Sequence, residues 1–180
     1  MRNLTRAPGR WALTLAMLAA VAGASTLTTG CFPRRGFITI GTAIDILPHG
    51  FISVTLGGGR YYYHRGIFYR PYRGGFLVVP APIGAVIPGP PPGYVMVLVE
   101  NDPFAYYRGV FYAPMGAEYV VVRPPLGAFV RTLPPGAVTR RVGGVEFKEY
   151  AGAWYRPAIR DGDRGYQVTD PPDGGEDGPG

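Results

Sequence analysis

The sequence predicts an all-β fold made of tandem antiparallel β-meander repeats. The first indication is composition, because glycine and proline, the weakest helix formers, account for 28 and 20 of the 180 residues. The second is that the chain is 13% aromatic and only 17% charged, which is the opposite of a disordered composition. The third is a pattern of strands and turns that recurs every 43 residues. A fixed period of this length indicates an array of structural units.

Residues 1–30 have the pattern of an export signal, and we expect this segment to be helical. Three arginines precede an apolar run from Trp11 to Ala24. The run is shorter than the roughly 20 residues that span a membrane and is typical of a signal-peptide core. Two cleavage sites compete. Cleavage after Ala24 would leave a soluble periplasmic or secreted chain, whereas cleavage before Cys31 would leave a lipoprotein.

Cys31 is the only cysteine, so the chain has no intramolecular disulfide, and an unpaired thiol in an exported protein needs an explanation. The segment from Leu27 to Cys31 resembles a bacterial lipoprotein box, although Thr28 stands where the commonest form has leucine. Acyl chains add about 0.8 kcal/mol of membrane affinity for each buried CH₂. We therefore predict that Cys31 is acylated and anchored in the lipid bilayer. By the same resemblance, Phe32 in place of aspartate favours the outer membrane.

The mature chain is predicted to hold three repeats preceded by half a repeat. The repeats span residues 47–89, 90–132 and 133–172. Residues 31–46 form the mature N-terminus, with one strand expected at 36–40 because this segment is similar to 75–79. The third repeat gains four residues at 161–164, after which Tyr166 corresponds to Phe76 and Tyr119. Residues 173–180 form an acidic tail that we expect to be disordered.

About four short strands are expected in each repeat. In the first strand Ile52, Val54 and Leu56 alternate with polar residues, so they share one face. An aromatic strand at 61–64 and another at 67–70 follow, joined by two residues that end in glycine, which is a strong hairpin signal. After a loop, a valine-rich strand at 76–79 leads into a proline-rich connector.

A unit of 43 residues is marginally stable alone, so neighbouring repeats are expected to share a core. Three units are too few to close a propeller, which typically has four to eight blades. We therefore expect small barrel-like or stacked units.

The strings YYYHRGIFYRPYRGGFLVVPAPIGAVIPG, FAYYRGVFYAP and VVVRPPLGAFVRTLPPGAV resemble a bacterial domain family of unknown function. Its members are exported or lipidated chains that repeat a Tyr-rich hairpin, a YYRP-like segment, a valine strand, a PPxGA connector and an LPPG turn. The resemblance covers roughly residues 36–172 and implies location and architecture without an activity. The third repeat is the most divergent, with Glu149 in place of Tyr63 and Tyr106.

Few side chains are suited to catalysis or metal binding. After Cys31 the chain has one serine, Ser53, and two histidines, His49 and His64, neither of which recurs in the other repeats. A site formed by His49, His64 and Asp45 has no ligand spacing typical of zinc. We therefore predict that the protein is not an enzyme and holds no cofactor or metal.

The first repeat carries arginines and tyrosines but no acid between residues 47 and 89, in a chain of net charge +6. Arginine beside aromatic rings suits phosphate and carboxylate groups. The candidate ligand-binding residues are Arg60, Tyr61, Tyr63, Arg65, Tyr69, Arg70 and Arg73.

These observations predict a non-enzymatic cell-envelope lipoprotein with a structural or adhesive Tyr-rich surface. One alternative is a module that binds an anionic glycan, lipid headgroup or phosphate through the first repeat. A second alternative is the soluble chain cleaved after Ala24. Expected partners are the lipid bilayer, anionic envelope polymers and other envelope proteins, but not nucleic acid, because the chain is exported.

Overall fold

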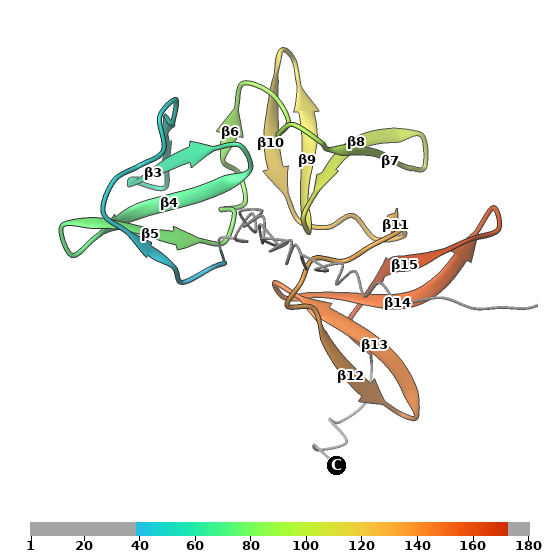
Figure 1. Ribbon diagram of the computed structural model, residues 1–180. Coiled ribbons are helices and arrows are strands. Elements are labelled where there is room, and N and C mark those ends of the chain that lie inside the picture. The colour runs from blue at the N-terminus through green and yellow to red at the C-terminus, as the bar shows by residue number, and fades with distance from the viewer. Residues whose placement is uncertain (1–38, 173–180) are drawn as a thin grey trace, which may run out of the picture. The chain divides into compact units, whose positions relative to one another are not determined.

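The computed structural model describes residues 39–172 and has an all-β fold, as predicted (Figure 1). The description below concerns these residues only. In this part of the chain no helix is long and apolar enough to cross a membrane. The predicted signal helix, Cys31 and the acidic tail at 173–180 lie outside the described residues.

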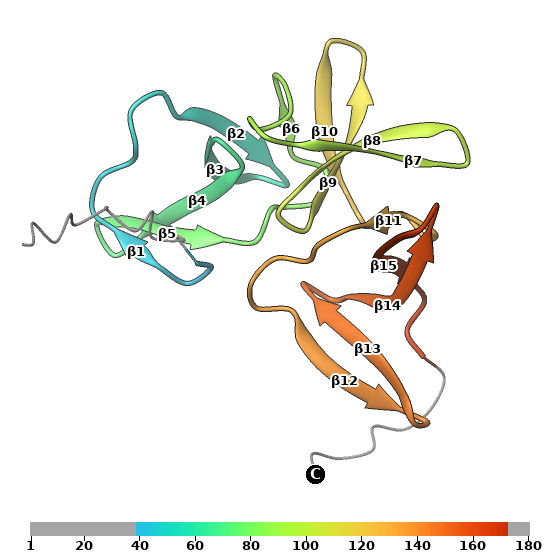
Figure 2. The same cartoon turned by 45° about the vertical axis from the view of Figure 1, so that its right-hand side comes forward.

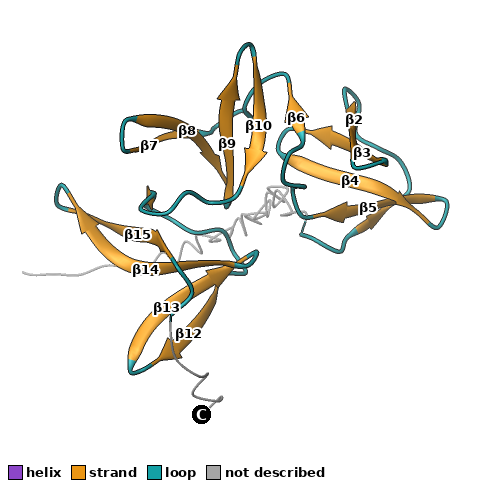
Figure 3. Cartoon of the chain, turned by 180° about the vertical axis from the view of Figure 1, so that it is seen from behind, coloured by secondary structure: helices purple, strands orange, loops and turns teal. Residues whose placement is uncertain are grey.

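Within residues 39–172, fifteen strands form three five-stranded antiparallel sheets (Figures 1, 2 and 3). The first sheet contains β1 (Ala43–Ile44), β2 (Ile52–Leu56), β3 (Gly59–His64), β4 (Ile67–Tyr72) and β5 (Gly75–Val79). The middle sheet contains β6 (Val86–Ile87), β7 (Val95–Val99), β8 (Asp102–Tyr107), β9 (Val110–Met115) and β10 (Glu118–Val122). The third sheet contains β11 (Phe129–Val130), β12 (Val138–Val142), β13 (Val145–Tyr150), β14 (Ala153–Arg160) and β15 (Asp163–Thr169).

Each sheet has one strand more than the expected four. The additional strand is a two-residue segment that precedes the others in sequence and pairs with the last strand of its sheet, so that the first sheet has the order β1-β5-β4-β3-β2. Ala43 pairs with Leu77, and Val86 pairs with Val120. The proline-rich connector therefore leads directly into the first strand of the next sheet. No strand is present at Thr39 and Ile40, the described part of 36–40; both precede β1.

Two-residue turns connect the four longer strands within each sheet, because this geometry matches the right-handed twist of paired strands. At the predicted turn between β3 and β4, Arg65 has φ 46° and Gly66 has φ 87°, as in a type I′ turn. The expected loop between β4 and β5 is an equally tight turn, with φ 48° at Arg73 and 83° at Gly74.

The four additional residues of the third repeat lengthen its last hairpin without shifting its register. Pro157 pairs with Tyr166, in the same way that Pro71 pairs with Phe76 in the first sheet. This pairing confirms the correspondence between Tyr166 and Phe76 that the sequence predicts.

Two hydrophobic clusters join the sheets, and they use equivalent positions. The first cluster combines Val54, Tyr63 and Phe68 of the first sheet with Ile87, Tyr112 and Val121 of the middle sheet. The second combines Val97, Tyr106 and Phe111 of the middle sheet with Val130, Tyr155 and Val168 of the third. Because the middle sheet contributes alternate residues to each cluster, it is packed on both faces. The sheets thus share cores, as expected for stacked units.

Candidate functional site

A tyrosine at each junction lies against a glycine of the preceding sheet. A Cβ atom on Gly66 would lie only 2.7 Å from Cδ1 of Tyr107 and 3.1 Å from Cβ of Pro91. At the second junction, a Cβ atom on Gly109 would lie 2.7 Å from Cδ1 of Tyr150. These glycines therefore serve two purposes: they adopt the positive φ of the turn, and they leave room for an aromatic ring of the next sheet.

Three tyrosines at each junction are close enough to influence one another's ionisation. They are Tyr63, Tyr107 and Tyr112 at the first junction, and Tyr106, Tyr150 and Tyr155 at the second. Burial raises the pKa of Tyr63 to about 12 and that of Tyr155 to about 12. Both side chains belong to the hydrophobic clusters that join the sheets.

The phenol groups of the junctions differ in hydrogen bonding. Tyr106 donates its hydroxyl to the backbone carbonyl of Thr132 over 3.0 Å, and so links the middle sheet to the segment after β11. The buried hydroxyls of Tyr112 and Tyr155 have no hydrogen-bond partner among the described residues. For these two residues the ring, and not the hydroxyl, supplies the packing.

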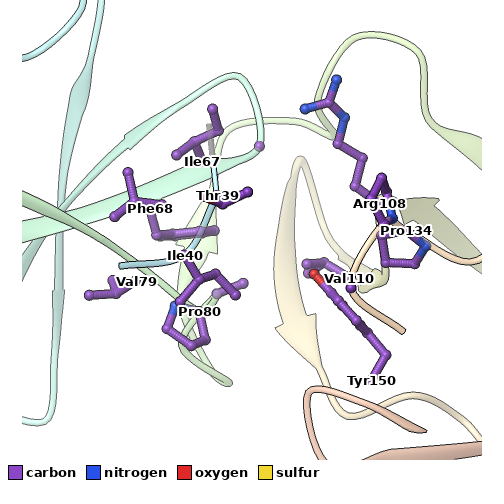
Figure 4. Close-up of a pocket in the computed structure, with 15 residues that line it drawn as sticks. Thr39, Ile40, Ile67, Phe68, Val79, Pro80, Arg108, Val110, Pro134 and Tyr150 are labelled. Carbon is purple, nitrogen blue, oxygen red and sulfur yellow. The ribbon is translucent and has the colours of Figure 1, made fainter. Parts of the chain in front are cut away.

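An apolar cleft of about 340 Å³ lies beside the first junction (Figure 4). Ile67, Phe68 and Val79 line it from the first sheet, and Val110 lines it from the middle sheet. Figure 4 shows Tyr150 and Arg108 on the Val110 side of this space. The guanidinium of Arg108 also lies 5.3 Å from the ring centroid of Tyr107. The cleft thus has apolar walls and one cationic residue.

The strand register does not bring the seven candidate ligand-binding residues to one face. Tyr63 and Tyr69 are buried, Tyr61 is half-buried, and Arg60, Arg65, Arg70 and Arg73 are exposed. Tyr63 pairs with Phe68, which places Arg70 on the same face as these two residues. Tyr62 pairs with Tyr69, which places Arg60 on the opposite face.

Arg65 and Arg73 lie at opposite ends of β4, a strand of six residues, and are therefore separated by roughly 20 Å. These positions do not form a single anion site. Binding of an anionic ligand by individual arginines stays a prediction.

His49, His64 and Asp45, which the sequence did not favour as a catalytic or metal site, are divided between the two edges of the first sheet. His49 and His64 both line a cleft of about 370 Å³ near Pro91. Asp45 follows β1 and lies beside Gly75, whereas β1 and β2 are at opposite edges of the sheet. The three residues are thus not brought together. Within residues 39–172 there is no group of three His, Cys, Asp or Glu side chains that could hold a metal ion.

An exposed apolar strand in the middle sheet is a feature that the sequence interpretation missed. Val95 and Leu98 are each 61% exposed and Met96 is 47% exposed, all in the edge strand β7. The polar equivalents of Met96 in the other sheets are Ser53 and Thr139, and those of Leu98 are Thr55 and Arg141. This difference between aligned repeats is the signal that could have revealed the surface.

Three stacked antiparallel sheets with equivalent aromatic junctions define the chain as a tandem β-repeat protein. Its sequence belongs to a family of unknown function (DUF6515), whose profile matches residues 32–171. Comparisons with curated proteins and with solved structures give no match.

Proposed function

We propose that the chain is a non-enzymatic lipoprotein of the cell envelope that has a structural or adhesive role. The observation that carries the proposal is the repeated junction, in which a tyrosine of one sheet packs against a turn glycine of the preceding sheet. Because both junctions use equivalent residues, each pair of neighbouring sheets packs in the same way. Such an array suits a protein that acts through its surface.

The sequence supports an anchor for this array. Cys31 follows a signal-like segment and precedes the first residue matched by the family, Phe32. Acylation at this position would attach the array to the bilayer through a short segment ahead of β1. Partners in the envelope would then meet the sheets close to the membrane surface.

Metabolic labelling with an alkyne fatty acid tests the anchor. We expect label on the wild-type chain and none on Cys31→Ala, which lacks the thiol. An unlabelled wild-type chain in the soluble periplasmic or secreted fraction would instead support cleavage after Ala24. Label that persists in Cys31→Ala would also contradict attachment at this residue.

Complementation of a deletion strain tests the structural role. We expect wild-type protein to restore resistance of the envelope to detergent, and Gly66→Val to restore less, because the valine would displace Tyr107 from the first junction. His49→Ala/His64→Ala is the matched control and should restore resistance fully. Loss of function in the histidine variant, with Gly66→Val fully active, would contradict a structural role and support an enzymatic one.

A further inference from the structure

We propose that β7 pairs with β7 of a second copy of this chain, so that two middle sheets form one continuous antiparallel sheet. The proposal concerns the sheet array alone and goes beyond the function proposed above. It rests on the edges of the sheets, on the exposure of β7 and on the register that self-pairing would give.

Exposed sheet edges invite pairing with other chains, and proteins usually protect them. One edge of each sheet is a strand of only two residues: β1, β6 or β11. The opposite edges are β2, β7 and β12, each of five residues. Strand β12 carries two adjacent arginines, Arg140 and Arg141, and β2 carries Ser53 and Thr55 between its apolar residues. Strand β7 has the sequence VMVLV, with no polar residue.

Several side chains of β7 are apolar although they are exposed to solvent. Val97 belongs to the core, but Met96 and Leu98 point to the other face of the strand and are about half or more exposed. Removal of these side chains from water would contribute favourable free energy to association. Because the first and third sheets have polar residues at these positions, the apolar residues of β7 are not a requirement of the repeat.

Antiparallel self-pairing centred on Val97 gives a compatible register. Met96 would lie opposite Leu98 of the second copy, and Val95 opposite Val99. The acidic residue that follows the strand would also face an uncharged partner, because Glu100 would lie opposite Tyr94. Like charges directly opposite one another are destabilising, and this register has none. A parallel arrangement in register would instead place Glu100 beside Glu100.

Strand β7 is the last strand of its sheet, so its outer edge has no partner strand among the described residues. Pairing about a two-fold axis uses the same strand on both copies and therefore closes at a dimer. The expected assembly is thus a dimer and not a fibre.

Sedimentation velocity on the full exported chain with Cys31→Ala tests the pairing without the lipid anchor. We expect concentration-dependent dimers, and a dissociation constant raised more than tenfold by Met96→Ser/Leu98→Thr, which introduces the residues of β2. The matched control is Val145→Thr/Ile159→Thr, which removes two exposed apolar side chains elsewhere and should leave the dimer unchanged. A monomer at all concentrations, or equal effects of both double variants, would overturn the proposal.

Disulfide cross-linking tests the register separately. Directly opposite residues have Cβ atoms about 4.5–5.5 Å apart, close to the distance that a disulfide spans. In the Cys31→Ala background, a mixture of Met96→Cys and Leu98→Cys chains should form more covalent dimer on oxidation than either variant alone. A mixture of Ser53→Cys and Thr55→Cys chains is the control. Equal dimer yields from the two mixtures would refute pairing through β7.

Discussion

Replacement of Gly109 by alanine tests whether the junctions depend on the space above a turn glycine. Gly109 is buried between β8 and β9 and has φ 87°. A Cβ atom there would lie 2.7 Å from Cδ1 of Tyr150 and 3.0 Å from Cγ of Pro134. These atoms belong to the rings of Tyr150 in β13 and of Pro134 in the segment before β12. Gly109→Ala should therefore strain the second junction as well as its own turn.

The magnitude of the effect has two contributions. A residue with a Cβ atom in the left-handed region costs about 1–2 kcal/mol, and overpacking of a close contact costs about 1–3 kcal/mol more. Gly152 separates the two contributions, because it occupies the equivalent turn at φ 78° and a Cβ atom there would meet no neighbour within 4 Å. We therefore expect Gly152→Ala to lower the free energy of unfolding by about 1–2 kcal/mol and Gly109→Ala by about 2–5 kcal/mol.

Urea denaturation followed by tyrosine fluorescence and circular dichroism measures both variants against the wild type. Gly66→Ala, at the first junction, should resemble Gly109→Ala. Equal destabilisation by Gly109→Ala and Gly152→Ala would refute the reasoning, because the cost would then come from the turn backbone and not from contact between sheets.

Three further predictions concern the junctions and the end of the array. Tyr106→Phe should lower the free energy of unfolding by about 1 kcal/mol because it removes a hydrogen bond, whereas Tyr112→Phe should be neutral or stabilising; thermal denaturation of both variants checks this contrast. Burial raises the pKa of Tyr63 and Tyr155 from 10.0 to about 12. Their contribution to stability should therefore be complete below about pH 10 and be lost as the pH rises to about 12. Urea midpoints measured across this pH range would show the loss. Arg140→Val/Glu149→Tyr replaces an ion pair of 3.0 Å on the third sheet by the valine and tyrosine that stand at these positions in the two junctions. The double variant should therefore self-associate more strongly in size-exclusion chromatography, and an unchanged elution volume would contradict this.

The repeat and its turns were predictable because they depend on local residues. Glycine at 66, 109 and 152 marks the same turn in all three repeats, and the conformation of a two-residue turn is set within the turn itself. The two-residue strands were not predictable in this way. Ala43–Ile44 is too short to show an alternating pattern, and it forms a strand only because β5 lies beside it.

The candidate site was less predictable than the fold, because it depends on which sheet covers which face. The alternation of Tyr61, Tyr62 and Tyr63 shows that the strand has two faces, but it does not show which face is covered. In the structure Tyr63 packs against the middle sheet. Conversely, the apolar residues of β7 fit a buried strand, yet Met96 and Leu98 are exposed. In both cases burial is decided by a neighbour distant in sequence.

Each described sheet is built from five strands that are consecutive in the sequence. The chain can therefore fold sheet by sheet as it emerges from the ribosome or from a translocation channel. The farthest paired residues of the first sheet, Ala43 and Leu77, are only 34 positions apart in the sequence (77 − 43). A sheet can therefore complete its hydrogen bonding as soon as its own residues have emerged, without waiting for the C-terminus. Each new sheet then needs only the preceding one as a template for its hydrophobic face, so folding can proceed from the N-terminus in steps of one repeat.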